Sequence, residues 1–198
     1  MPLASPNKQA TDLLTKRITN ENRLPANLTD TSNMEAQPLA KLSHHTAAVN
    51  VIRWSPCGTL LASGGADGVV AIWQIFVTGG IENERWSVAR EHHLHVADLL
   101  DVAWSPDLDH IASCAVDNRL IVYNIMNTFN LCISLTEIVK GLAWDPLNDL
   151  LAGERDNGAG VIVWKVTKNE DKIGLEVVKE IKELYEKYPF PTQFRRFK

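Results

Sequence analysis

The sequence predicts an all-β protein, a partial β-propeller of about three four-stranded antiparallel blades with an incomplete stub at each end. The first observation behind this prediction is a series of short apolar runs, five or six residues long and bounded by turn-forming residues. Leu99–Trp104, His110–Ala115 and Leu120–Ile125 form such a series. The second observation is that the series recurs every 40 to 50 residues, which is the period of propeller blades.

A repeated Trp-x-Pro sequence marks the same point in three units. Its tryptophans are Trp54, Trp104 and Trp144, each at the end of an apolar run that leads into a proline turn. An aspartate follows this marker tryptophan by 13, 13 and 12 residues, and an aromatic residue follows it by 19, 19 and 20. These positions are Asp67 and Trp73 in the first unit, Asp117 and Tyr123 in the second, and Asp156 and Trp164 in the third.

A histidine and a serine complete the pattern in the first two units. His45 and His95 precede the marker tryptophan by nine residues, and Ser63 and Ser113 precede the aspartate by four. At these residues the chain resembles WD-repeat proteins, which implies a hydrogen-bonded network of His, Ser, Asp and the aromatic residue inside each blade. A short carboxylate suits this role, because it can accept the backbone N–H groups that a tight turn leaves unpaired.

The third unit departs from the pattern. Leu135 stands where the histidine belongs, and Gly153 stands where the serine belongs. Asp156 and Trp164 remain, so we expect an incomplete network and a weaker blade.

The order of segments along the chain follows from these repeats. Residues 1–37 are rich in Asn, Thr, Pro, Ser and Ala, which predicts a mobile leader or linker, and Gln37–Leu42 is expected to form an outer strand. The WD-repeat region is expected at 38–181, and residues 182–198 are expected to be a linker and the start of a further, truncated blade. Within the repeat region, we place the blades at about 43–90, 93–135 and 136–181.

Strands are predicted in chain order from the innermost outward. In blade one they are Val49–Trp54, Thr59–Ser63, Val69–Ile75 and, after a polar insertion, Trp86–Arg90. Blade two ends with Asn130–Leu135. Blade three uses Ile138–Trp144, Asp149–Gly153, Gly160–Val166 and Gly174–Ile181. The conformation of residues 175–188 stays open, because Val178, Ile181, Tyr185 and Tyr188 also fit a helical period.

Composition and charge narrow the classes of function. The net charge is −4, but residues 39–166 alone carry fourteen acids and eight bases. This balance disfavours direct sequence-specific nucleic-acid binding, which needs a basic surface, and suits a basic partner. No apolar run is long enough to cross a membrane. The three cysteines lack the spacing of a zinc site or a disulfide framework.

Two sets of residues could form a metal site or a catalytic triad, and for both sets we favour a purely structural role. His92, His93, His95 and Asp98 contain metal-ligating groups. His45, Ser63 and Asp67 contain the residue types of a hydrolase triad. The triad recurs at the blade period as His95, Ser113 and Asp117, and His95 of the metal-ligating set already belongs to the blade pattern, so we expect no enzyme, no metal and no cofactor.

Longer strings indicate a closer resemblance, to the N-terminal propeller of the HIR/HIRA histone-regulator family. The strings are VIRWSPCGTLLASGG (51–65), RWSV (85–88), LDVAWSP (100–106), ASCAVDN (112–118), VKGLAWDPL (139–147) and FRR (194–196). The middle subunit of chromatin assembly factor one is similar too, at AVNVIRWSP, at the insertion before RWSV and at FRR. ASCAVDN and VKGLAWDP favour the histone-regulator side.

This resemblance implies a scaffold subunit of a nuclear histone chaperone complex, acting in replication-independent nucleosome assembly and transcriptional repression. Its partners would be sister subunits and, directly or indirectly, histones H3–H4. The alternatives are a replication-coupled chromatin assembly factor subunit and a generic WD-repeat adaptor in a ubiquitin or signalling complex. For partner contact we select the acidic residues around the entry to blade two: Asp98, Asp101, Asp107 and Asp109.

Three blades are fewer than the four to eight of a closed propeller. We therefore expect a fragment, a truncated gene product or an aberrant family member with exposed outer strands. Expressed alone, the chain should be insoluble or oligomeric.

Overall fold

The computed structural model of the chain describes residues 40–77, 84–126, 130–156, 160–169 and 172–182. In these ranges the backbone forms twelve strands, arranged as three four-stranded antiparallel sheets. Within each sheet the strands follow chain order, as successive hairpins require. The predicted all-β class and its three antiparallel blades are confirmed.

Each sheet corresponds to one repeat of the sequence. Blade one contains β1 (Val49–Trp54), β2 (Leu60–Gly65), β3 (Val70–Val77) and β4 (Glu84–His92). Blade two contains β5 (Leu99–Trp104), β6 (His110–Ala115), β7 (Arg119–Asn124) and β8 (Asn130–Ser134). Blade three contains β9 (Val139–Trp144), β10 (Leu150–Arg155), β11 (Val161–Asn169) and β12 (Lys172–Ile181).

Most strand predictions are correct to within a few residues, with one exception. Residues 40–42 form no strand, so the predicted outer strand at 37–42 is wrong where the structure describes it. The predicted strand Gly174–Ile181 is confirmed as part of β12, which decides the open conformation of residues 175–181 in favour of a strand. The leader, residues 183–188 and the stub at 193–197 lie outside the described residues.

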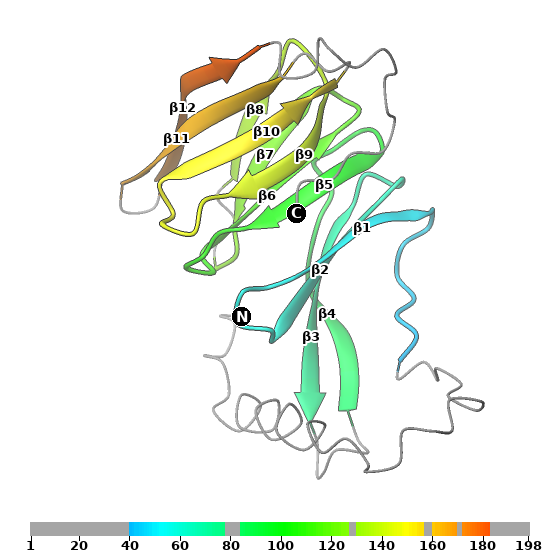
Figure 1. Cartoon of the computed structure of the whole chain (residues 1–198). Helices are drawn as coiled ribbons and strands as arrows, with labels where there is room; N and C mark the ends of the chain where they lie inside the picture. Colours follow the sequence, from blue (N-terminus) through cyan, green and yellow to red (C-terminus); the bar gives the residue numbers. More distant parts are fainter. Residues whose placement is uncertain (1–39, 78–83, 127–129, 157–159, 170–171, 183–198) are drawn as a thin grey trace, which may run out of the picture.

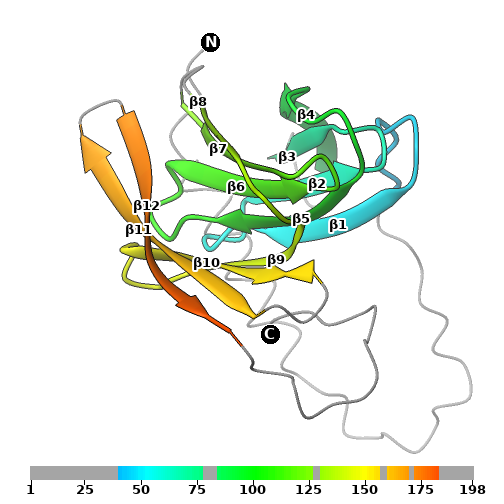
Figure 2. The ribbon, with the colours of Figure 1, turned by 90° about the horizontal axis from the view of Figure 1, so that it is seen from above.

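The three blades fan outward from their first strands. β1, β5 and β9 lie side by side where the sheets meet, and the later strands of each blade lie progressively further out (Figure 1, Figure 2). Blade two lies between the other two blades. Every residue of its strand β6 is therefore buried.

Register is the same in all three blades. In each blade the marker tryptophan pairs with an aliphatic residue, which pairs in turn with the aromatic residue of the repeat. These rows are Trp54–Leu61–Trp73, Trp104–Ile111–Tyr123 and Trp144–Leu151–Trp164. We call the side of a blade that carries this row its near face, and the opposite side its far face.

Two core clusters fill the spaces between blades. The near face of blade two packs on the far face of blade one, with Trp104, Ile111 and Tyr123 against Ala62 and Ile72. The near face of blade three packs in the same way on the far face of blade two, placing Leu151 and Trp164 against Ala112 and Val122. Each blade boundary therefore repeats the same pairing of faces.

Candidate interaction site

The predicted residues of blade one form a continuous hydrogen-bonded chain. His45 Nδ1 lies 3.0 Å from the nearer Asp67 carboxylate oxygen, and His45 Nε2 lies 2.7 Å from Ser63 Oγ. Ser63 Oγ accepts a hydrogen bond of 2.8 Å from Trp73 Nε1. Asp67 also accepts the backbone N–H groups of Thr46 and Val69. Burial raises the pKa of Asp67, but the bonds from His45 and the two amides outweigh this effect and hold it below its usual value.

Blade two repeats the arrangement more deeply buried. His95 Nδ1 lies 3.0 Å from Asp117, and His95 Nε2 lies 2.8 Å from Ser113 Oγ. Ser113 Oγ and the Tyr123 hydroxyl are 3.0 Å apart, so tyrosine takes the place of the blade-one tryptophan. Burial lowers the pKa of His95 and raises the pKa of Tyr123, which favours the neutral form of both rings.

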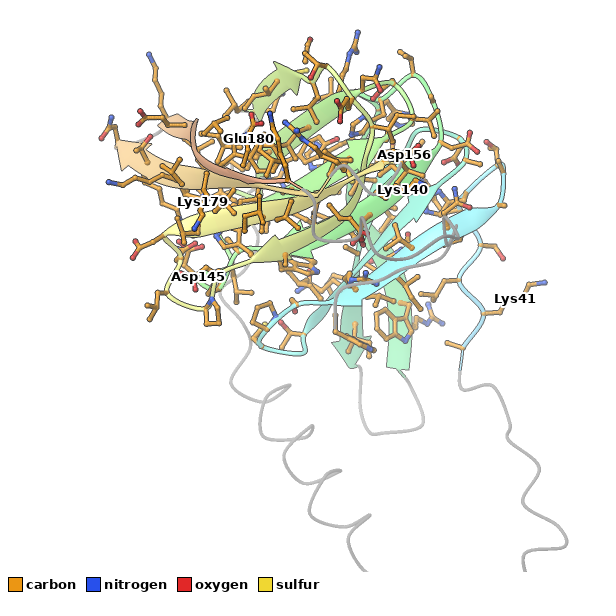
Figure 3. The ribbon with its side chains drawn as sticks, turned by 45° about the horizontal axis from the view of Figure 1, so that its top comes forward. Lys41, Lys140, Asp145, Asp156, Lys179 and Glu180 are labelled. Carbon is orange, nitrogen blue, oxygen red and sulfur yellow. The ribbon has the colours of Figure 1, made fainter. Side chains whose placement is uncertain are left out.

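In blade three the ring of Trp164 fills the space that the serine side chain would occupy. A Cβ built on Gly153 would lie 2.9 Å from two ring carbons of Trp164 and 2.9 Å from Val139 Cγ1. Leu135 packs against the core shared with blade two, in place of a histidine that would reach the turn. Asp156 forms an ion pair with Lys140 of β9 (Figure 3).

The order Ser63–His45–Asp67 has the connectivity of a hydrolase triad, but its surroundings oppose catalysis. Ser63 is 4% exposed, and its oxygen already accepts the Trp73 N–H, so it is poorly accessible to a substrate. The equivalent Ser113 is completely buried. Both serines therefore suit a scaffold role.

The histidine cluster before blade two does not converge. His95 belongs to the blade network, the His92 ring packs on Tyr123 at a centroid distance of 4.4 Å, and the His93 side chain is exposed. Across the part of the chain that the structure describes, no group of three His, Cys, Asp or Glu residues is arranged to hold a metal ion.

The four acidic residues selected for partner contact do not form one surface. Asp98 precedes β5 and is exposed at one end of that strand, whereas Asp109 is exposed in the turn at its other end. Asp107 lies in the same turn and forms an ion pair with Lys168 of blade three. Burial of Asp107 is offset by its bond from Lys168 and by other donors, so its pKa is well below the usual value. Of the four, only Asp98 and Asp109 are exposed without a described ion pair.

The prediction that Asp101 is an accessible loop residue is wrong. It lies within β5, is 6% exposed, and accepts hydrogen bonds from Arg53 Nη2 at 2.7 Å and from the backbone N–H of Leu142 at 3.0 Å. Its carboxylate thus joins the innermost strands of all three blades. The sequence holds one trace of this role, an aspartate inside the apolar run LLDVAW.

Two blade faces lie uncovered by the residues that the structure describes, and neither was predicted. On the near face of blade one, Ile52 is 60% exposed and Trp54 is 56% exposed, and Trp54 contacts Trp86 of β4 at a ring centroid distance of 5.7 Å. On the far face of blade three, Ala143 and Leu150 are exposed. Contiguous exposed apolar surface of this kind marks sites of protein contact.

No helix in the described ranges is long and apolar enough to span a membrane.

A model of the CAF1B/HIR1 beta-propeller domain matches residues 24–157. The chain is 35% identical over 130 residues to a chromatin assembly factor 1 subunit of Gallus gallus, covering 58% of this chain and 23% of that protein. It is 32% identical over 169 residues to protein HIR1 of Cryptococcus neoformans, covering 80% of this chain and 18% of that protein.

The chain therefore spans about a fifth of the length of these curated relatives. Among solved structures, a chain of the mitotic checkpoint complex matches with a TM-score of 0.55 and 21% identity, covering 70% of this chain and 41% of that chain. This likeness concerns the fold alone.

Proposed function

This chain belongs to the CAF1B/HIR1 beta-propeller domain family, and on that premise we propose that it is a scaffold subunit of a nuclear histone chaperone complex. Its role would be replication-independent nucleosome assembly and transcriptional repression. The observation that carries the proposal is the match of the family model, which includes all of blades one and two and strands β9 and β10 of blade three.

The chemistry of the described residues supports binding rather than catalysis. Hydrogen-bonded networks hold the turns of blades one and two, so the loops at the blade ends are rigid platforms for a partner. The serines that resemble nucleophiles are buried in those networks. Recognition by rigid loops makes and breaks no covalent bond.

Charge supports a basic partner. The excess of acids over bases in residues 39–166 gives this region a charge of −6, which would attract histones H3–H4, directly or through a sister subunit. Asp98 and Asp109 are our candidate contacts, because both carboxylates are exposed in loops. They lie in two different loops, at opposite ends of β5.

A second candidate is a subunit of a replication-coupled chromatin assembly factor. It is favoured by the 35% identity to the chromatin assembly factor 1 subunit of Gallus gallus, which exceeds the 32% identity to HIR1. The HIR1 alignment is longer, covering 80% of this chain against 58%, and this greater coverage is why we place the replication-independent role first.

Affinity purification of the tagged chain from nuclear extract, followed by mass spectrometry, tests the proposal. Recovery of replication-independent histone chaperone subunits would support it, and recovery of the other subunits of chromatin assembly factor 1 would support the second candidate. A ubiquitin-ligase or signalling set without either would contradict both. Asp98→Asn and Asp109→Asn variants, purified in parallel, would show which loop binds, because both side chains are exposed and neither holds a hydrogen bond among the residues that the structure describes.

A further inference from the structure

Blade two carries a patch of exposed aliphatic side chains on the loops at one of its ends. Leu94 and Val96 lie in the loop that precedes β5, and Val116 lies in the turn between β6 and β7. Val96 is 78% exposed, Val116 is 45% exposed and Leu94 is 37% exposed. We call these three residues the blade-two patch. Described blades pack on both sides of blade two, so this exposure does not arise at either end of the blade series.

Hydrogen bonds hold the two loops of the patch together. The backbone N–H of Val96 donates to the carboxylate of Asp117 at 3.1 Å. The backbone N–H of Val116 donates to the carbonyl of Asp98 at 3.0 Å. The two valines are therefore presented by an ordered backbone, and a partner that binds them loses little free energy in ordering these loops.

The other blades show that the fold does not require aliphatic side chains at these positions. Thr46 and Ala66 stand at the positions of Val96 and Val116 in blade one, where they donate the same backbone hydrogen bonds. In blade three the position of Val116 is taken by Asp156, which forms an ion pair with Lys140. Both valines also lie outside the two core clusters. A group of exposed aliphatic side chains that packing does not account for is typical of a protein contact site.

The charge beside the patch is mainly negative. Histidines apart, the loops at this end of blades one and two (43–48, 66–69, 93–98 and 116–119) carry the acids Asp67, Asp98 and Asp117 and the single base Arg119. Burial lowers the pKa of His95, so its neutral ring does not offset the charge of Asp117. Asp98 is exposed and lies directly beside Val116. Such a surface attracts the side chains of lysine and arginine.

We propose that the blade-two patch and Asp98 form a docking site for a protein segment that combines an aliphatic side chain with a lysine or arginine. The aliphatic side chain packs on Val96 and Val116, and the cation pairs with the carboxylate of Asp98. This site goes beyond the proposed function, because it states where on the chain a partner binds and which side chains that partner presents, whichever complex supplies it.

A peptide selection tests the docking site. The 198-residue chain is immobilised and panned against a phage-displayed library of random linear peptides, and the affinities of the enriched peptides are measured by fluorescence polarisation. Enriched peptides should carry an aliphatic residue close to a lysine or arginine. A double variant, Val96→Thr with Val116→Ala, has the residues of blade one and should bind these peptides about tenfold more weakly. Asp98→Asn should weaken binding about threefold and make it less sensitive to salt.

Leu147→Asp is the matched control. Leu147 is 79% exposed in the turn after β9, at the opposite end of the blades, and blade two has an aspartate at this position. This variant should bind the peptides as the wild type does, and circular dichroism should show that all variants are folded.

Three results of the selection overturn the proposal: no enriched peptide, enriched peptides without the aliphatic and basic pair, or peptides that bind the double variant as tightly as the wild type. Self-association of the wild type that the double variant abolishes, measured by light scattering, would assign the patch to a second copy and would also overturn it. These results are independent of the subunits recovered from nuclear extract, so the chaperone role is judged separately.

Discussion

The guanidinium of Arg53 donates a hydrogen bond of 2.7 Å to the carboxylate of Asp101, across the boundary between blades one and two. The same carboxylate accepts the Leu142 backbone N–H of blade three. One side chain therefore holds three blades in register at the point where their first strands meet. Polar contacts of this kind add directional constraint to the apolar cores on either side, whose packing alone tolerates small displacements.

Asp101→Ala should lower the free energy of unfolding by about 2–3 kcal/mol, because it removes a charged acceptor and leaves a buried backbone N–H and Arg53 without it. Chemical denaturation followed by circular dichroism measures the loss. Asp109→Ala is the matched control, and as an exposed substitution it should stay within about 0.5 kcal/mol of the wild type. Equal effects of the two substitutions would contradict a structural role for Asp101.

Ser113→Ala should cost about 1–3 kcal/mol, because it leaves His95 Nε2 and the Tyr123 hydroxyl buried without their shared partner. Ser134→Ala, on the exposed outer strand β8, is the control and should change stability little. Thermal melts of both variants give the comparison. A Ser113→Ala variant that melts with the wild type would show that the blade-two network adds nothing to stability.

The repeat spacing explains how much of this fold could be predicted from the sequence. Turn residues and apolar runs recur with the marker tryptophan, so β1, β5 and β6 were located to the residue. All three first strands contain a bulge, between Val49 and Val51, between Leu99 and Asp101, and between Val139 and Gly141, which local pattern does not reveal. The His, Ser and Asp positions contact one another across 18 to 22 residues, but they lie within one blade and recur at the blade period, so the repeat indicated them.

The interaction surface depended on contacts that sequence spacing does not encode. Asp101 meets partners 48 and 41 residues away, so its burial follows from how blades pack rather than from its own strand. Trp54 and Trp104 share the Trp-Ser-Pro sequence but differ in exposure. Blade one covers Trp104, whereas no described blade covers Trp54. The sequence shows that Gly153 stands in place of the repeat serine, but only the structure shows that the Trp164 indole fills the space of the missing side chain.

Restoring the repeat residue in blade three should destabilise the protein. In Gly153→Ser the new Cβ would lie 2.9 Å from the Trp164 ring and from Val139, so buried groups must shift, at a cost of about 1–3 kcal/mol. Ala152→Ser, one residue away on the partly exposed far face, is the control. Denaturant midpoints of the two variants decide the matter, and a Gly153→Ser variant more stable than the wild type would contradict this packing.

The turn after each marker tryptophan needs a residue in the left-handed conformation. Gly58, Leu108 and Asn148 occupy that position, with φ of 71°, 67° and 67°. Leucine is disfavoured there and asparagine is tolerated, so Leu108→Asn should stabilise the fold by about 0.5–1 kcal/mol. Gly58→Leu should destabilise it by about 1–2 kcal/mol through the backbone alone, since no atom lies within 4 Å of the added Cβ. Opposite shifts in melting temperature are the expected result, and shifts of the same sign would contradict it.

Acid sensitivity should follow from His92. Burial, reinforced by the charges of Arg90 and His93, lowers the pKa of His92 from 6.5 to about 4, while its ring packs on Tyr123. Below pH 6.5 the unfolded chain gains this proton and the folded protein does not, so stability is lost as the pH falls from about 6.5 to 4. This shift accounts for about 2 kcal/mol after allowance for partial exposure.

His92→Phe keeps a ring on Tyr123 and cannot be protonated, so the free energy of unfolding of this variant should fall less steeply between pH 6.5 and 4. Lowered pKa values of His95 and His110 leave a residual slope. Urea titrations at several pH values give both profiles, and parallel profiles for wild type and variant would show that His92 does not set the acid limit.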